Sequence, residues 1–122
     1  MTVFLFRTGT MLVTVTDYGM VRIWSAEGEL IHELNQHTGW ITAVKWSRTN
    51  QAMEQEYILS ASSDKTTIVW NPQDGTVKQQ FKFHTDVVWN VDWQNNEVFA
   101  SCSCDQTIQA VKIGQNTTVK VI

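Results

Sequence analysis

A two-part phrase recurs along the chain, and it constrains the fold more than any other feature. The first part reads "HTGWITAVKW" at 37–46 and "HTDVVWNVDW" at 84–93. The second part reads "SSDKTTIVW" at 62–70, with counterparts in "DYGMVRIW" at 17–24 and "SCDQTIQAV" at 103–111. Successive copies lie 41 to 47 residues apart. A repeat of this period indicates units of one supersecondary type stacked side by side.

Each repeat is expected to consist of short strands. In the middle repeat, apolar and polar residues alternate with a period of two, which is typical of strands. We predict strands near 41–47, 57–63, 66–71 and 77–83, separated by turn residues. Four antiparallel strands in a repeat of this length predict a WD40 β-propeller blade. The expected fold class is therefore all-β: a partial WD40 β-propeller of about two and a half four-stranded antiparallel blades.

The repeat boundaries divide the chain into three units. We expect residues 1–36 to form a partial blade, 37–83 a complete blade and 84–122 a nearly complete blade. A propeller closes into a ring of roughly four to eight blades, and each blade buries its faces against its neighbours. Either the chain is a fragment of a larger propeller, or several copies complete a ring as a homo-oligomer. The segment 48–57 is longer than expected, and its role is open.

The recurring polar residues predict a hydrogen-bond chain inside each blade. A buried Trp and a buried His need partners for their polar atoms. In a WD40 blade a turn aspartate, an entry histidine, a strand hydroxyl and a tryptophan supply these partners to one another. For the middle blade we assign His37, Ser62, Asp64 and Trp70, with Ser60 as the alternative serine.

The other two units depart from this pattern. The third keeps His84, Ser103 and Asp105 but has Val111 where the tryptophan belongs, so we expect it to be the weaker blade. In the first unit Tyr18 stands six positions before the tryptophan, and no His-Thr precedes it. Its network is therefore expected to be incomplete.

Two kinds of loop position are candidates for partner binding, because propellers bind on rims where loops of several blades converge. One precedes the turn aspartate, and the other opens the first strand of a blade. These candidates are Asp17, Ser63 and Cys104, and Trp40, Thr42 and Trp89. Aromatic residues at a rim are typical binding anchors. Packing between adjacent blades is the alternative explanation for the two tryptophans.

Several other functions find no support in the residues. The His, Ser and Asp recur by repeat position beside a Trp, which indicates a structural network and not a catalytic triad. Cys102 and Cys104 lack the second ligand pair of a structural zinc site, so we expect no metal and no cofactor. A net charge of −3 without a basic cluster argues against direct sequence-specific nucleic-acid binding. No apolar run has the roughly eighteen residues that spanning a membrane requires.

Two stretches carry a family resemblance: "DKTTIVWNPQDGTVKQQFKFH" at 64–84 and "VDWQNNEVFASCSCDQTIQAVKIGQ" at 91–115. Together with the preceding blade, they resemble the WD40 domain of the transducin β-like corepressor subunits, the F-box-like/WD-repeat proteins. The resemblance implies a nuclear protein-interaction scaffold. Its implied partners are a nuclear-receptor corepressor, a histone deacetylase complex and histone tails. The alternative is a generic WD40 adaptor, such as a ubiquitin-ligase substrate receptor.

Overall fold

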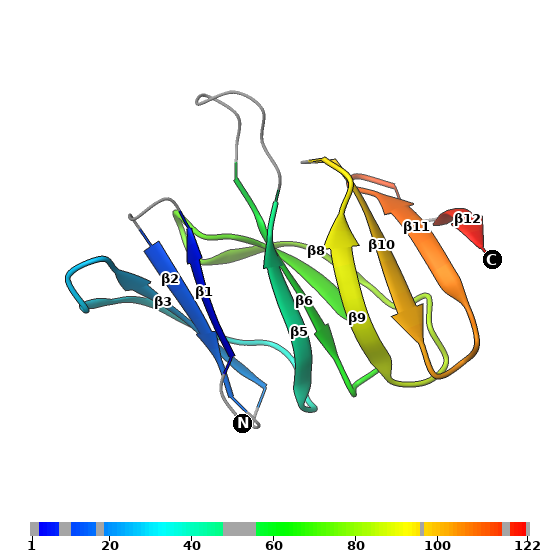
Figure 1. Cartoon of the computed structure of the whole chain (residues 1–122), viewed down its shortest axis with the longest axis horizontal. Coiled ribbons are helices and arrows are strands. Elements are labelled where there is room, and N and C mark those ends of the chain that lie inside the picture. Colours follow the sequence, from blue (N-terminus) through cyan, green and yellow to red (C-terminus); the bar gives the residue numbers. More distant parts are fainter. Residues whose placement is uncertain are drawn as a thin grey trace.

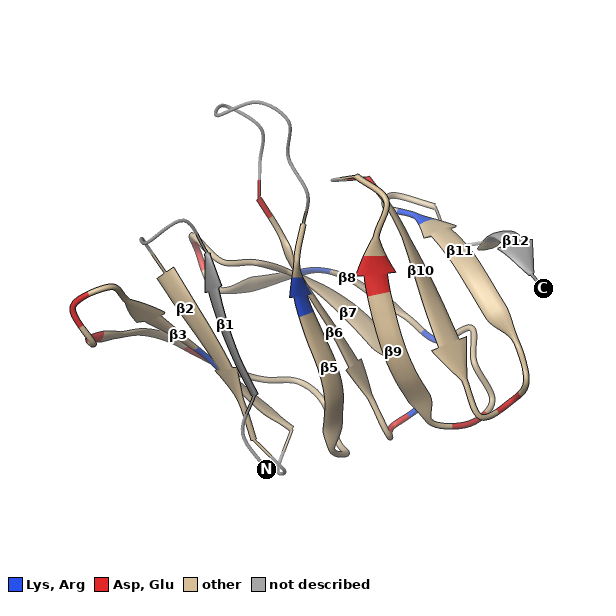
Figure 2. Ribbon diagram, in the orientation of Figure 1, with Lys and Arg blue, Asp and Glu red and all other residues tan. Residues whose placement is uncertain are grey.

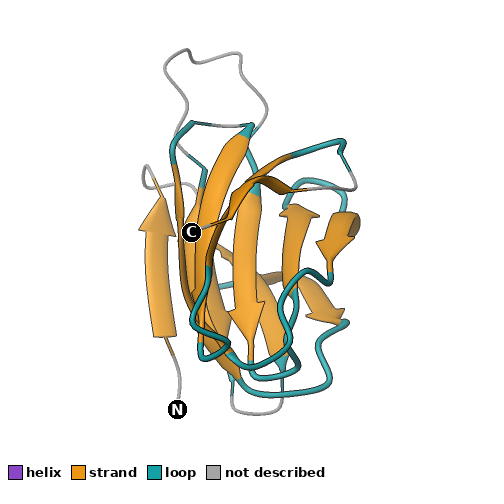
Figure 3. Cartoon of the chain, turned by 90° about the vertical axis from the view of Figure 1, so that its right-hand side faces the viewer, coloured by secondary structure: helices purple, strands orange, loops and turns teal. Residues whose placement is uncertain are grey.

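All regular structure in the described part of the chain is β-strand. The computed structural model describes residues 3–7, 11–16, 19–47, 56–95, 97–115 and 118–121 (Figure 3). The strands are β1 (Val3–Arg7), β2 (Met11–Val15), β3 (Met20–Ser25), β4 (Leu30–Asn35), β5 (Ile41–Trp46), β6 (Ile58–Ser62), β7 (Thr67–Asn71), β8 (Thr76–Phe81), β9 (Val88–Trp93), β10 (Val98–Ser103), β11 (Ile108–Lys112) and β12 (Thr118–Val121).

The strands form three separate four-stranded sheets, in the orders β1-β2-β3-β4, β5-β6-β7-β8 and β9-β10-β11-β12. Within each sheet, every strand pairs antiparallel with the next one in the chain, so each sheet is a meander. Figure 1 shows the sheets fanned side by side, as the blades of a propeller are. The predicted all-β architecture of four-stranded antiparallel blades is confirmed. The expected divisions after residues 36 and 83 fall in the connections between sheets.

The first blade is complete, whereas the sequence predicted that residues 1–36 form only a partial blade. β1 pairs with β2 from Val3↔Val15 to Arg7↔Met11 and so gives this blade its fourth strand. The estimate of two and a half blades was therefore too low, because the structure contains three four-stranded sheets. A short apolar run such as "VFLF" has no periodicity that identifies it as a strand.

The long insert connects β5 to β6, and most of it (48–55) lies outside the described residues. Its base is described. The Ser47 amide donates to the Tyr57 carbonyl at 2.8 Å, and the Tyr57 amide donates to the Ser47 hydroxyl at 2.8 Å. The hairpin is thus closed by two hydrogen bonds where the insert begins and ends.

Two apolar cores hold the blades together, and each lies between neighbouring sheets. The first core joins Val13, Val15, Val21, Ile23 and Leu34 of the first blade to Ile41, Val44, Ile58, Ile68 and Trp70 of the middle blade. The second joins Ala43, Leu59, Ala61, Val69 and Phe81 of the middle blade to Val88, Val91, Trp93, Phe99 and Val111 of the third. The same strand positions recur in both cores, so one packing scheme is used twice.

The outer face of the third blade has no neighbouring sheet in the described structure. Leu59 and Ala61 in the middle blade are fully buried by the next blade. Ala100 and Cys102 occupy the corresponding positions and are exposed and half-buried, while the adjacent Ile108 is 47% exposed. This is the face onto which another blade stacks in a propeller.

Candidate functional site

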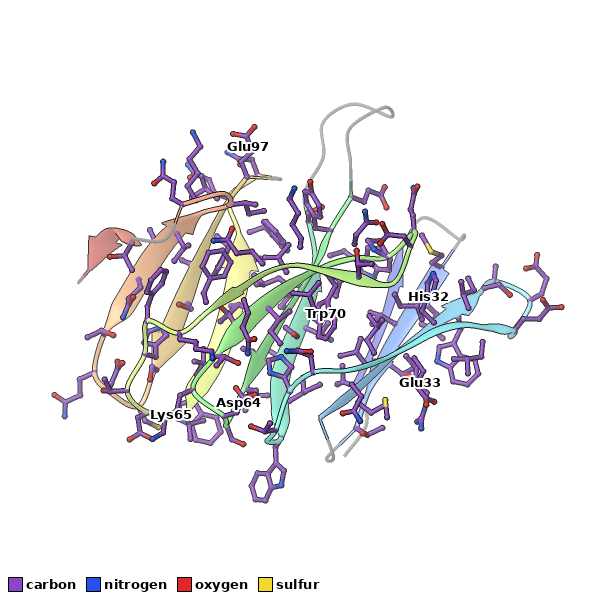
Figure 4. All side chains as sticks on the ribbon, turned by 180° about the vertical axis from the view of Figure 1, so that it is seen from behind. His32, Glu33, Asp64, Lys65, Trp70 and Glu97 are labelled. Carbon is purple, nitrogen blue, oxygen red and sulfur yellow. The ribbon has the colours of Figure 1, made fainter. Side chains whose placement is uncertain are left out.

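The middle blade contains a complete hydrogen-bond chain from tryptophan to aspartate. The Trp70 indole Nε1–H donates to Ser60 Oγ at 2.8 Å, and Ser60 Oγ lies 2.7 Å from His37 Nε2. His37 Nδ1 lies 2.8 Å from Asp64 Oδ2. Because an ionised carboxylate only accepts, Nδ1 carries the hydrogen, and in the neutral imidazole the Ser60 hydroxyl then donates to Nε2. Figure 4 shows Trp70 in the body of the blade and Asp64 at its lower edge.

Ser60, and not Ser62, is the serine of this chain, so the primary sequence assignment was wrong and its alternative was right. Ser62 Oγ instead accepts the Asp64 amide at 3.0 Å. The two serines stand two residues apart on one strand and therefore point to the same face. Sequence alone does not say which of them lies level with the imidazole. The pairing register between β6 and β7 decides this, because it places Ser60 opposite Ile68, which is two residues before Trp70.

Four donors surround the Asp64 carboxylate. Oδ2 accepts from His37 Nδ1 and from the Thr38 amide at 3.0 Å. Oδ1 accepts from the Thr66 amide at 2.9 Å and from the Thr66 hydroxyl at 2.5 Å. Burial alone would raise the pKa of Asp64, but the hydrogen bonds from His37, Thr66 and Thr38 outweigh it and hold the pKa well below its ordinary value. The aspartate is therefore an ionised structural anchor for the loop that enters the blade.

The third blade repeats this geometry without the tryptophan. His84 Nε2 lies 2.7 Å from Ser101 Oγ, and His84 Nδ1 lies 2.8 Å from Asp105 Oδ2. Ser103 was assigned to this chain, and that assignment was wrong for the same reason as Ser62. Its hydroxyl accepts the Asp105 amide at 3.1 Å and donates to the Asp86 carbonyl at 3.1 Å. Ser101 takes the position that Ser60 has in the middle blade.

Val111 stands where the tryptophan would be, as the sequence indicated, and it pairs with Phe99 as Trp70 pairs with Ile58. Gln109 extends into the network instead. Its Nε2 donates to the Phe83 carbonyl at 2.9 Å, while its Oε1 is buried without a hydrogen-bond partner among the described residues. A buried unpaired oxygen is costly, but the middle blade also has a buried polar atom without a described partner, Trp46 Nε1, so the weaker third blade stays a prediction.

Two threonines complete the networks, and the sequence analysis missed them. Thr107 supplies its amide at 2.9 Å and its hydroxyl at 2.5 Å to Asp105 Oδ1, as Thr66 does to Asp64. These bonds, with those from His84 and Thr85, lower the pKa of Asp105 against the opposing effect of burial. The recurring "D-x-T" at 64–66 and 105–107 was the signal that could have revealed them.

Among the described residues of the first blade, one bond of the network is present, so the expectation of an incomplete network stays a prediction. The Trp24 indole donates to Thr14 Oγ1 at 3.0 Å. Thr14 therefore takes the place of the serine. Asp17 and Tyr18 lie outside the described residues, so the rim position assigned to Asp17 remains a sequence prediction.

The two candidate rim tryptophans are the most exposed large apolar residues of the described chain. Trp40 is 69% exposed and Trp89 is 57% exposed. The Trp40 backbone is fixed by Ser63, whose hydroxyl accepts the Trp40 amide and whose amide donates to the Trp40 carbonyl, both at 2.8 Å. The Trp89 indole donates to Cys104 Sγ. Ser63 and Cys104, the residues before the turn aspartates, thus each contact one of the two tryptophans.

Thr42 is placed differently from the other rim candidates. It is half-buried, and its hydroxyl donates to the Val88 carbonyl at 2.5 Å, which joins β5 to β9. This geometry supports packing between blades for Thr42, which the sequence had suggested as a rim position. Trp40 and Trp89 do not pack between blades in this way, because their rings are largely exposed to solvent.

The two serines of β6 allow a direct test of the revised assignment. We expect Ser60→Ala to lower the free energy of unfolding by about 2–3 kcal/mol, because it leaves buried polar atoms of Trp70 and His37 without a partner. Ser62→Ala should cost only about 1 kcal/mol, since it removes one hydrogen bond beside the turn. Urea denaturation followed by far-UV circular dichroism measures both. If Ser62→Ala proved the more damaging of the two, the revised assignment would be wrong.

The described residues form neither a metal-binding cluster nor a membrane-spanning helix. No group of three or more His, Cys, Asp or Glu side chains is arranged to hold a metal ion within the described ranges. In the same part of the chain, no helix has the length and apolar character needed to cross a bilayer. Cys102 is half-buried and Cys104 is exposed, and both are free thiols.

Comparison with known proteins agrees with this geometry. The family model for the WD domain, G-beta repeat, matches residues 28–71 and 74–110. The WD40 β-propeller domain of Doa1 superposes with a TM-score of 0.76 at 24% sequence identity, covering 97% of this chain and 38% of that one. The chain therefore belongs to the WD40-repeat family, and its sheets are propeller blades.

Within that family, a particular group of relatives stands out. The chain is 47% identical over 112 residues to the human F-box-like/WD repeat-containing protein TBL1X, covering 92% of this chain and 18% of that protein. It is 40% identical over 114 residues to the WD40 repeat-containing protein HOS15 of Arabidopsis thaliana, again covering 92% and 18%. The resemblance to the transducin β-like proteins is thus confirmed. The chain spans about a fifth of the length of these curated relatives.

Proposed function

We propose that this chain is a protein-interaction scaffold, contributing WD40 blades to a nuclear corepressor subunit whose complex contains a histone deacetylase. The observation that carries the proposal is the 47% identity to TBL1X, which extends over 92% of the chain and across all three blades. Histone tails are further candidate partners in this role. The chain spans only 18% of TBL1X, so the activities of the whole protein are part of the proposal.

The His-Ser-Asp geometry favours a scaffold over an enzyme. His37 is 3% exposed and Ser60 is fully buried. A nucleophile must be reached by substrate and lie beside donors for the developing oxyanion. The buried hydroxyl is enclosed between an indole and an imidazole, so we assign it a structural role and propose no covalent chemistry.

The proposed binding surface, here called the tryptophan rim, consists of Trp40, Ser63, Trp89 and Cys104. Exposed tryptophans on rigid strand ends are strong anchors, because they bury a large area with little loss of side-chain freedom. Asp17 belongs to this surface only as a sequence prediction, while Thr42 is assigned to the contact between blades.

Affinity capture tests the proposal. We expect the tagged chain, expressed in cells, to capture corepressor and histone deacetylase subunits, and the double variant Trp40→Ala/Trp89→Ala to capture at least tenfold less. Circular dichroism should show both proteins equally folded, since both side chains are exposed. Capture of ubiquitin-ligase subunits in place of a histone deacetylase would favour the adaptor alternative, which the words "F-box-like" in the TBL1X name also suggest. Equal capture by both proteins would exclude the tryptophan rim.

A further inference from the structure

A polar cleft of about 440 Å³ lies at the loop end of the middle blade, where three segments converge. Gln36 and Thr38 come from the connection between β4 and β5, and Asp64, Lys65 and Thr66 come from the turn between β6 and β7. Gln80, Lys82 and His84 come from the end of β8 and the connection that follows it. The cleft is therefore built from all three repeats. Figure 4 shows Lys65 beside Asp64 at this edge.

The charges of this cleft are unbalanced. Lys65 and Lys82 are both exposed, and neither makes an ion pair with any described residue. The carboxylate of Asp64 also lines the cleft, but both its oxygens are occupied by the four donors from His37, Thr38 and Thr66. Asp64 stays ionised and offsets one of the two ammonium charges, so the cleft keeps a net positive charge and neither lysine has a described carboxylate as a direct partner, in a chain whose net charge is −3.

A charged residue at this turn position is found only in the middle blade. Lys65 has a φ of 76° and Gln106, its counterpart in the third blade, has a φ of 71°, so both turns hold this residue in the same left-handed conformation. The turn therefore fixes the backbone of either residue in the same way. The lysine therefore adds a charge that the glutamine does not. Figure 2 shows the acidic turns of the third blade next to this part of the middle blade.

From these observations we propose that this cleft, here called the lysine cleft, binds a carboxylate-rich segment, with aspartate or glutamate side chains, of a partner protein. The inference rests on the proposed scaffold function, because it names the chemistry of one partner surface. Ammonium groups act as compact point charges and pair well with single carboxylates. Phosphate sites favour the bidentate fork of arginine, and no arginine lines this cleft. A singly charged carboxylate also tolerates the nearby acidic turns better than a dianion does.

A second cleft on the chain provides a matched control. It has a volume of about 360 Å³ and is also lined by two exposed lysines, Lys78 and Lys112. In contrast to the lysine cleft, it includes the exposed carboxylate of Glu97. Each cleft thus holds two lysines and one carboxylate, but the oxygens of Asp64 are held by their four donors, whereas Glu97 is exposed and competes directly with an added ligand for its lysines. We therefore expect an acidic ligand to prefer the lysine cleft.

The test is a titration of the full chain with an octaglutamate peptide, followed by ¹⁵N–¹H correlation spectra. We expect shifts confined to the lysine cleft, and about tenfold weaker binding by the double variant Lys65→Gln/Lys82→Gln. Lys78→Gln/Lys112→Gln has the same change in net charge and should bind as the parent does. An octalysine peptide should not bind at the cleft, and raising the salt concentration should weaken the octaglutamate complex.

Three results would overturn the inference: equal losses in the two double variants, shifts spread over the whole surface, or binding only of a phosphoserine peptide of the same length. Unchanged spectra outside the substituted sites would show that both double variants remain folded. The proposed function is tested separately through the tryptophan rim. If octaglutamate does not bind while cellular partners are still captured, only this inference fails; if capture also fails, the scaffold proposal fails with it.

Discussion

Trp70→Ala should lower the free energy of unfolding by about 3–5 kcal/mol, the largest effect we expect from any single substitution in this chain. Trp70 is 2% exposed and lies in the core between the first and middle blades. Its removal leaves a large cavity and takes away the indole donor of Ser60. A domain is stable by only about 5–15 kcal/mol, so this loss would remove a large fraction of the total stability.

Trp40→Ala is the matched control for this prediction. It removes the same side chain from a position that is 69% exposed, and it should change stability by no more than about 0.5 kcal/mol. Far-UV circular dichroism during urea denaturation suits both variants, because its signal does not depend on tryptophan fluorescence. Comparable midpoints for the two variants would show that Trp70 is not the buried residue described here.

Asp64→Ala is the second substitution with a large expected effect, about 3 kcal/mol. It removes the acceptor of four hydrogen bonds at once and leaves the buried Nδ1 of His37 without its partner. Glu29→Ala serves as the control, since that carboxylate is exposed in the turn between β3 and β4. Thermal unfolding of the parent and both variants measures the difference. A Glu29→Ala protein as unstable as Asp64→Ala would contradict the anchoring role of Asp64.

Asp64→Ala should also change how the stability of the chain depends on pH. The pKa of Asp64 in the folded chain lies below its ordinary value of 3.8. The unfolded chain therefore binds the proton more readily, so the stabilisation by Asp64 is fully present well above pH 3.8 and is lost as the pH falls below it. Asp105 contributes with the same sign. Urea midpoints measured through the acid range should fall steeply for the parent and less steeply for Asp64→Ala, and equal slopes would contradict this.

The sequence predicted the architecture well because the repeat period and the strand alternation are local signals that agree with each other. It also brought together His37, Asp64 and Trp70, since their positions recur by repeat. It failed at the serines because Ser60 and Ser62 share a face, as do Ser101 and Ser103. Which one contacts the imidazole depends on the register between β6 and β7, and register is set by contacts that a single strand does not reveal.

Other features lay beyond the sequence for different reasons. β1 has no repeat signature, so only its pairing with β2 identifies it as the fourth strand of a blade. The lysine cleft combines three segments that stand far apart in the chain, and the availability of its lysines depends on which carboxylate oxygens are already bonded. Thr42 and Trp40 are close in sequence, yet one bonds the next blade and the other faces solvent.

The central claim is that a directed chain of hydrogen bonds, from indole through hydroxyl and imidazole to carboxylate, stabilises the middle blade from within. Long-range ¹⁵N–¹H NMR of the histidine rings near neutral pH tests it most directly. The geometry predicts that His37 carries its hydrogen on Nδ1 and accepts at Nε2, with the Trp70 indole hydrogen strongly protected from exchange. A His37 ring protonated at Nε2 alone, or a Trp70 indole that exchanges as fast as that of Trp40, would contradict it.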